Sequence, residues 1–196
     1  QLCAFTAPDV YVDISIPQEC LDEGCGFSNN PFKTIARTFE MINPTEDNPI
    51  TIHLAAGTYS PDTGESFPID LMSYLNIEGE DEETTILDAM QTGRVFSLLQ
   101  NDHNNILSNI TITGGSASWG GGMHLTNSHP TLSNVTIADN NGIGMYLNNS
   151  NPIITGMSIT DNNGHGIEAS SSTATLTDVI ITDNNGYGVY SGSSPG

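Results

Sequence analysis

A repeat of 22 residues near the end of the chain limits the folds that this sequence can adopt. Three consecutive segments align without gaps, and each has the motif DNNGxG at the same position. Units this short cannot bury an apolar face alone, so they must stack on one another as a solenoid. The three segments are Thr131–Pro152, Ile153–Ala174 and Thr175–Gly196; a fourth copy, Ile106–Pro130, aligns once three extra residues are allowed in its glycine-rich turn.

Each unit contains two short runs in which apolar and polar residues alternate. In the second unit Ile154, Met157 and Ile159 precede the turn, and Ile167 follows it. A period of two indicates strands whose apolar side chains point inward. The repeat is too short for a propeller blade and lacks the Leu/Asn pattern of a leucine-rich repeat. We therefore predict an all-β fold: a right-handed, single-stranded parallel β-helix with coils of about 22 residues. The predicted inward columns are Leu132/Ile154/Leu176, Val135/Met157/Val179, Ile137/Ile159/Ile181 and Met145/Ile167/Val189.

Polar residues also recur at fixed positions in the repeat. Stacked asparagines can hydrogen-bond along the axis of a solenoid, so two asparagine ladders are expected. Glycines at two positions of the same turn are expected to supply the positive φ angles of the corner. The predicted ladders are Asn140/Asn162/Asn184 and Asn141/Asn163/Asn185, and the glycine columns are 142/164/186 and 144/166/188.

Residues 1–49 do not repeat and are predicted to form an N-terminal cap. Apolar residues at helical spacing predict a short helix from Pro31 to Ile42, opened by Asn30 or Pro31, that covers the first coil. Residues 50–105 are predicted to form irregular first coils, and residues 106–196 the regular ones, all in one continuous domain. The short strands expected in the irregular coils are Thr51–Leu54, Phe67–Leu71, Leu75–Ile77, Thr85–Leu87 and Val95–Leu98.

The last repeat ends without a cap, so its strand edges are expected to be open. We expect the natural protein to continue with further repeats, or this end to dock on another copy of the chain. The chain starts at Gln1, which is typical of a processed or trimmed terminus.

The charge of the chain excludes several partners. The 23 acidic residues and only three basic ones give a net charge of −20. This charge excludes nucleic acid and repels anionic membranes and polyuronates, and it attracts divalent cations. Membrane insertion is not expected, since no apolar run approaches the roughly 20 residues that span a bilayer.

The three cysteines lie within the first 25 residues. Cys20 and Cys25 can pair and close a short acidic loop, but Cys3 can equally pair with either of them. Three thiols without a nearby histidine make a poor zinc site. An oxidising compartment is therefore favoured.

The N-terminal part of the chain carries a family resemblance. The elements NPFKTIARTFEMI, ITIHLAAGTYS, TGESFPIDL and NIEGEDEETTILDA follow one another in this order. Together they resemble the N-terminal region of the pectin-lyase-like right-handed β-helix superfamily, and in particular a domain of unknown function found in large secreted bacterial and archaeal β-helix proteins. The resemblance implies a fold and an exported location, but no reaction.

Catalysis is not favoured by the residues present. A lyase needs a base and cationic groups, but Lys33 and Arg37 lie on the predicted cap helix, Arg94 stands alone, and no basic residue follows it. A hydrolase needs two carboxylates, and a column of aspartates offers neighbours ~4.8 Å apart. Aspartate before Asn-Asn-Gly is, however, typical of a tight turn; calcium bridging is the lesser alternative and catalysis the least. That column is Asp139/Asp161/Asp183.

The remaining titratable residues give no catalytic or metal pattern. The five histidines lack metal-binding spacing, and an acidic run is interpreted as a solvated turn with cation binding as its lesser alternative. No cofactor is predicted, and Ca²⁺ is the one ion considered. The histidines are His53, His103, His124, His129 and His165, and the acidic run comprises Glu78, Glu80, Asp81, Glu82 and Glu83.

One outward column contains residues suited to sugar. His124, Tyr146, Glu168 and Tyr190 follow the second glycine of each turn, and Trp119 lies in the inserted turn beside them. We call these five residues the aromatic surface. Aromatic rings next to polar groups suit a sugar ring, which has an apolar face and hydroxyl groups.

Two functional hypotheses follow. The first is a non-catalytic extracellular or cell-surface module with a structural or adhesive role, the solenoid acting as a rigid spacer. The second is a carbohydrate-binding module that uses the aromatic surface, with polysaccharide as its partner. A polysaccharide-active enzyme is the third and most distant reading.

Overall fold

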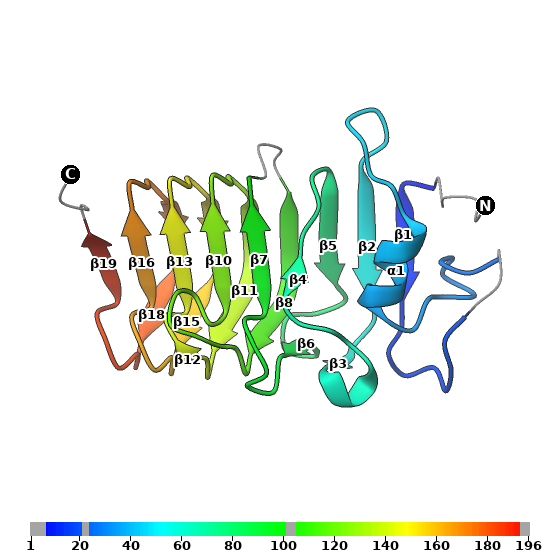
Figure 1. Ribbon diagram of the computed structural model, residues 1–196, viewed down its shortest axis with the longest axis horizontal. Coiled ribbons are helices and arrows are strands. Elements are labelled where there is room, and N and C mark those ends of the chain that lie inside the picture. The colour runs from blue at the N-terminus through cyan, green and yellow to red at the C-terminus, as the bar shows by residue number, and fades with distance from the viewer. Residues whose placement is uncertain (1–6, 21–23, 101–104, 193–196) are drawn as a thin grey trace.

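The chain forms a right-handed parallel β-helix of about six turns, with very little helix. The computed structural model describes residues 7–20, 24–100 and 105–192. Figure 1 shows the strands stacked side by side along the long axis, from β1 near the N-terminus to β19 near the C-terminus. All strand pairs between neighbouring coils are parallel, as the 22-residue repeat predicts. The predicted fold class is thereby confirmed.

Two large parallel sheets form the walls of the helix. The main path of the first sheet contains β1 (Asp9–Val12), β2 (Ile50–Leu54), β5 (Leu75–Gly79), β8 (Ile106–Thr113), β11 (Thr131–Ala138), β14 (Ile153–Thr155) and β17 (Thr175–Thr177). Paired beside this path are β3 (Gly57–Tyr59), β6 (Thr85–Asp88), β15 (Ser158–Thr160) and β18 (Ile180–Thr182). The second sheet contains β4 (Ile69–Asp70), β7 (Phe96–Leu99), β10 (Met123–Thr126), β13 (Met145–Asn148), β16 (Ile167–Ser170) and β19 (Val189–Gly192). A two-stranded sheet joins β9 (Ser116–Ala117) to β12 (Asn141–Gly142), and a single 3-10 turn, η1, spans Pro61–Thr63.

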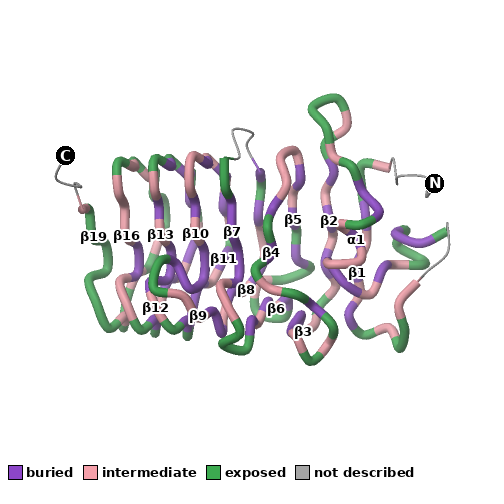
Figure 2. Tube along the Cα trace, in the orientation of Figure 1, coloured by how far each residue is buried: buried purple, intermediate pink, exposed green. Residues whose placement is uncertain are grey.

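The predicted inward columns are in register and buried. Leu132 pairs with Ile154, Ile137 with Ile159, and Met145 with Ile167, and all six side chains lie in the core. The same columns become exposed to solvent at the last described coil, where Leu176 is 41% exposed and Val189 is 53% exposed. Figure 2 shows this change from a buried interior to an exposed final coil.

The inner asparagine ladder joins successive turns. Asn140 donates its backbone N–H and its Nδ2 to Oδ1 of Asn162, at 3.1 and 2.9 Å, and Asn162 repeats both bonds to Asn184. The outer ladder is carried by Asn163, whose Nδ2 donates to Oδ1 of Asn141. Both ladders are confirmed.

The reason for the glycines at the corner differs from the expectation. Left-handed backbone occurs instead at the aspartate before each asparagine pair, with φ of 54° at Asp161 and 55° at Asp183. Among the predicted glycines only Gly142 has a positive φ, of 140°. Gly164 and its equivalents are needed for space: a Cβ there would lie 2.7 Å from the backbone carbon of Gly142 in the coil before it.

The cap helix is shorter than predicted and begins later. Helix α1 spans Ile35–Met41, and Thr34 is its N-cap, its hydroxyl accepting a hydrogen bond from the Arg37 N–H at 3.1 Å. Neither Asn30 nor Pro31 opens the helix, because the residues on this stretch form β-bridges instead: Asn30 with Phe27, and Phe32 with Val12. Figure 1 shows α1 lying beside β1 at the N-terminal end of the solenoid.

A buried carboxylate ties the start of α1 to a later loop. Glu65 accepts hydrogen bonds from the N–H groups of Ile35 and Ala36, at 2.7 and 3.2 Å, and is only 5% exposed. Burial raises the pKa of Glu65 to about 7; the two N–H groups oppose this shift and the charge of Glu19 adds to it.

The segment predicted as cap also contributes a strand to the solenoid. Strand β1 pairs in parallel with β2, so the first sheet begins at Asp9. A disulfide joins Cys20 to Cys25, with 5.8 Å between their Cα atoms, which decides between the alternatives for these two cysteines. Cys3 lies outside the described residues. In the described part of the chain, no helix is long and apolar enough to cross a membrane.

Candidate functional site

The aromatic surface lies on the outer face of the second sheet. In-register pairing places His124 beside Tyr146, Tyr146 beside Glu168, and Glu168 beside Tyr190. The four side chains therefore form one continuous column across β10, β13, β16 and β19, because parallel strands in register align equivalent positions. Three of the four side chains carry rings.

The inserted turn brings Trp119 onto this column. The Trp119 ring lies edge-on to the Tyr146 ring, with 5.1 Å between centroids, and Trp119 is 54% exposed. Arg94 holds the turn in place: its Nε donates to the Gly120 carbonyl at 2.8 Å and its Nη2 to the Trp119 carbonyl at 2.7 Å. An indole is thus presented to solvent from a turn that is fixed by two charge-assisted hydrogen bonds.

His124 is the electrically neutral end of the column. Burial, and secondly the positive charge of Arg94, lower the pKa of the His124 imidazole to about 4. Its Nε2 lies 3.0 Å from the Thr126 hydroxyl, whereas its Nδ1 is buried and has no partner among the described residues. The proton therefore belongs on Nε2, since a buried N–H without an acceptor is costly. The His124 ring also packs edge-on against Tyr146, at 5.1 Å.

A second group of rings extends the column at the C-terminal end. His165 and Tyr187 lie at the variable position of DNNGxG, and their rings stack at 5.3 Å. His165 also stacks on Tyr190, at 4.9 Å. Our sequence reasoning considered only the strand column and missed these two residues. Aligning the variable position of the motif, which holds Ile143 in the preceding unit, would have found them.

A cavity of about 400 Å³ lies on the outer face of the first sheet. We call it the β1–β5 pocket, because β1, β2 and β5 form its floor. Tyr11 pairs in register with His53, and His53 with Glu78, so these three side chains form a row across the floor. The rings of Tyr11 and His53 are nearly parallel, with 4.9 Å between centroids. The twelve residues that line the pocket are Tyr11, Val12, Asp13, Ser28, Pro31, His53, Leu54, Ala55, Glu78, Gly79, Glu80 and Asn109.

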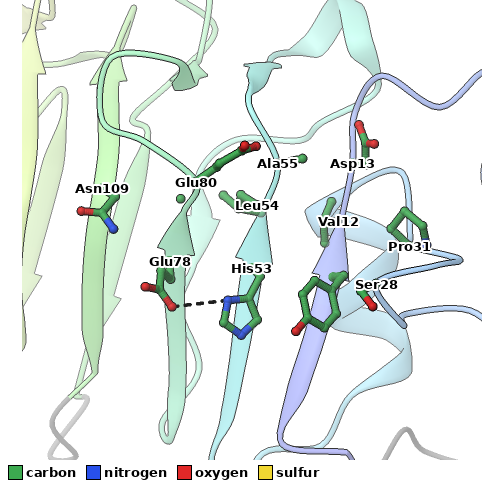
Figure 3. Close-up of a pocket in the computed structure, with 12 residues that line it drawn as sticks. Val12, Asp13, Ser28, Pro31, His53, Leu54, Ala55, Glu78, Glu80 and Asn109 are labelled. Carbon is green, nitrogen blue, oxygen red and sulfur yellow. Dashed lines mark ion pairs between the residues drawn. The ribbon is translucent and has the colours of Figure 1, made fainter.

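The β1–β5 pocket is bounded by segments from both of its sides. Ser28 and Pro31 belong to the cap loop, which is hydrogen-bonded to β1 through Tyr11. Asn109 of β8 lies on the other side of the pocket. Figure 3 shows Glu78, Glu80 and His53 between Asn109 and the cap loop. A pocket with two walls and a rigid floor can hold a small ligand in one orientation.

Carboxylates dominate the charge of this pocket. Asp13, Glu78 and Glu80 line it, while none of its lining residues is lysine or arginine. His53 lies between two carboxylates: its Nε2 is 2.9 Å from Asp9 Oδ1 and its Nδ1 is 3.3 Å from Glu78 Oε2. The pocket therefore carries net negative charge even when the imidazole is protonated.

Our sequence reasoning missed the β1–β5 pocket. The sequence predicts a solvated turn for the acidic run that contains Glu78 and Glu80, and it gives His53 no metal-binding spacing. The sequence does contain a signal for this pocket. Val10 and Val12 flank Tyr11, and Ile52 and Leu54 flank His53, so each segment has the alternation of a strand with its central side chain pointing outward. The prediction of a cap over residues 1–49 leaves Tyr11 outside the sheet, whereas the structure pairs it with His53.

The aspartate column fits the turn interpretation. Each of its three members has the left-handed backbone of a tight turn, and Asp161 Oδ2 accepts from the neighbouring Thr160 hydroxyl at 2.9 Å. Among the residues described, no group of three or more histidine, cysteine, aspartate or glutamate side chains is arranged to hold a metal ion. Calcium bridging stays a prediction.

The chain matches the model of one known protein family. One family profile, described as a protein of unknown function (DUF1565), matches residues 20–193. The chain belongs to this family. The match extends from the cap through the regular repeats, which confirms the resemblance seen in the sequence, and the family description gives no reaction.

Solved structures support the fold of this family member. A pectate lyase, Pel9A, superposes with a TM-score of 0.63 at 16% identity, over 90% of this chain and 48% of its own. The pectin methylesterase PemA from Erwinia chrysanthemi superposes with a TM-score of 0.52 at 11% identity, over 82% of this chain and 54% of its own. The chain thus spans about half the length of each, and at these identities the likeness shows the fold alone. No curated protein matches the sequence.

Proposed function

We propose that the chain is a non-catalytic extracellular β-helix module that adheres to a neutral polysaccharide through the aromatic surface. The observation that carries this proposal is the position of Trp119, 5.1 Å from Tyr146 and exposed above the second sheet. An exposed indole beside a tyrosine column offers apolar faces to sugar rings, and Glu168 offers an acceptor for hydroxyl groups.

The use of the basic residues supports a binding role over catalysis. A polyuronate lyase needs cationic groups at its site to stabilise developing charge. Arg94 is engaged with two backbone carbonyls, and Arg37 pairs with Glu40 at 2.7 Å on the cap helix. A net charge of −20 also disfavours an acidic glycan, so a neutral polysaccharide is the better ligand.

The cysteine pair supports an extracellular location. Cys20 and Cys25 form a disulfide between Asp13 and Ser28 in the sequence, two residues that line the β1–β5 pocket. Disulfides persist in oxidising compartments and are rare in the cytosol. The acidic surface is also consistent with an exported soluble module.

A glycan array that holds neutral, amino and uronate glycans tests this proposal. We expect binding to neutral polysaccharides and none to polyuronates. Isothermal titration with a bound neutral oligosaccharide should then show that Tyr146→Ala and Trp119→Ala each weaken the affinity at least about tenfold, as expected for central aromatic contacts.

The matched control removes an exposed apolar side chain from the other sheet. Ile153 is 52% exposed on β14, and Ile153→Ala should leave the affinity within about twofold. An array without neutral ligands, or full affinity in Tyr146→Ala, would contradict glycan adhesion and leave the rigid spacer as the function.

A further inference from the structure

We propose that the β1–β5 pocket binds an amino-sugar unit, with its ammonium group at the carboxylates of Asp13, Glu78 and Glu80 and its ring against Tyr11 and His53. This pocket lies on the first sheet and the aromatic surface on the second, so the proposal does not depend on the function proposed above. It concerns a separate site with a ligand of opposite charge to the protein.

The carboxylates of the pocket define the charge of the ligand. Glu80 Oε2 accepts from the Ala56 N–H at 3.0 Å, and Asp13 Oδ1 accepts from the Ser15 N–H at 2.9 Å and its hydroxyl at 2.6 Å. These bonds fix both side chains through one oxygen. Within the described residues, the second oxygen of each has no protein donor, so it is available to a ligand. Fixed carboxylates with free oxygens favour a donor that carries positive charge.

A metal ion does not suit this arrangement. A metal site built from protein side chains alone brings three or more ligands to one point. The described residues contain no such group, in this pocket or elsewhere. Glu78 lies within β5, Glu80 follows that strand and Asp13 follows β1; all three line a cavity of about 400 Å³. The ligand is therefore an organic cation that fills the space between them.

The remaining lining residues favour a sugar over a simple amine. The nearly parallel rings of Tyr11 and His53 lie at the floor, and Pro31 adds an apolar wall. A pyranose ring packs on such rings through its C–H groups. The hydroxyl of Ser28 and the amide of Asn109 provide further hydrogen-bonding groups around the rim. A cavity of this size lies in the range that small-molecule sites occupy.

The probe is a glucosamine trimer, with the N-acetylglucosamine trimer as its uncharged counterpart. Titration of the intact chain at mildly acidic pH should show binding of the glucosamine trimer and at least about tenfold weaker binding of the acetylated one, since charge-assisted bonds are lost. NMR shifts of backbone amides should be concentrated at Ala55 and Gly79, which line the pocket.

Isosteric variants separate the pocket from general electrostatic attraction. Glu80→Gln and Glu78→Gln should each lower the affinity for the glucosamine trimer about tenfold. Glu83→Gln removes the same charge from an exposed position in the neighbouring turn, outside the pocket, and should change the affinity less than twofold. Thermal melting of each variant checks that it is folded.

Three outcomes would overturn the proposal. Equal binding of the two trimers would show that the ammonium group is not recognised. An equal loss in Glu83→Gln and Glu80→Gln would assign the binding to overall charge. A lysine tripeptide that binds at the pocket while the glucosamine trimer does not would make the ligand a basic peptide. None of these results bears on Trp119 or Tyr146.

Discussion

The Trp119 ring meets the Tyr146 ring edge-on, at 5.1 Å and with 69° between their planes, although the two residues lie on different coils. The contact depends on the turn inserted before β10. That turn is anchored by Arg94, whose guanidinium donates to the Trp119 and Gly120 carbonyls. Trp119, the most exposed ring of the aromatic surface, is therefore positioned by a residue that does not belong to that surface.

Removing this anchor should release the indole. In Arg94→Ala we expect the single tryptophan of the chain to become more solvated and more mobile, because both bonds to the turn are lost. Tryptophan emission should shift to longer wavelength and its anisotropy should fall, with a loss of neutral-glycan affinity of about tenfold. Lys33→Ala removes a cation far from the turn and should change neither signal. Unchanged emission in Arg94→Ala would show that the turn is held by other contacts.

The neutral state of His124 has a consequence for stability at low pH. Its pKa is about 4 in the folded chain and near 6.5 when unfolded, so the unfolded chain takes up a proton first as pH falls. The free energy of unfolding should therefore decrease from about pH 6.5 toward pH 4. In His124→Gln this part of the pH dependence should be absent. Urea unfolding at several pH values measures the difference, and parallel curves for both proteins would contradict it.

Glu65 should act in the opposite direction. Its folded pKa of about 7 exceeds the value of 4.5 for an unperturbed glutamate, so the folded state retains a proton that the unfolded state releases. The stability from this group is fully present below pH 4.5 and is lost as pH rises through 7. Glutamine does not titrate, so the Glu65→Gln variant does not lose this stability. As pH rises from 4.5 to above 7, its free energy of unfolding should increase relative to that of the wild type by on the order of 3 kcal/mol.

The control for this prediction is the exposed Glu83→Gln, which should follow the wild type at every pH. Glutamine keeps an oxygen that can accept from Ile35 or Ala36, so helix α1 should remain in place. A Glu65→Gln variant that loses stability equally at pH 5 and pH 8 would show that the carboxylate is ionised throughout.

The regular coils could be predicted from the sequence because each position of the repeat has the same structural role in every coil. Ile137 and Ile159 share a column, and the asparagine ladder follows from the same offset of 22 residues. The reason why the corner needs glycine could not be predicted from the repeat. Gly164 is required by a neighbouring backbone, and the positive φ falls on Asp161, because packing between coils decides which residue takes the strained conformation.

The candidate sites were predictable only where they follow the repeat. The column of Tyr146 and Glu168 follows from the alignment, and their register is as expected. The β1–β5 pocket depends on the pairing of Tyr11 with His53, which are 42 positions apart and belong to coils without a shared sequence. A long-range pairing of this kind leaves only a short alternating pattern in each strand, which a cap segment can also contain.

The two asparagine ladders should differ in their contribution to stability. Asn162 is 1% exposed, and its Nδ2 donates to three acceptors: Oδ1 of Asn184 and the carbonyls of Ile137 and Thr160. Asn162→Ala leaves buried backbone groups without partners, so we expect a loss of about 2–4 kcal/mol in the free energy of unfolding.

Asn163 lies one residue further along and faces solvent, where it makes the equivalent side-chain bond to Asn141. Water replaces that bond when it is removed, so Asn163→Ala should cost less than about 1 kcal/mol. Denaturant unfolding of the two variants compares the same chemical change in buried and exposed positions of one turn. Equal losses would mean that stacking of amides, and not burial of the backbone groups around them, holds the coils together.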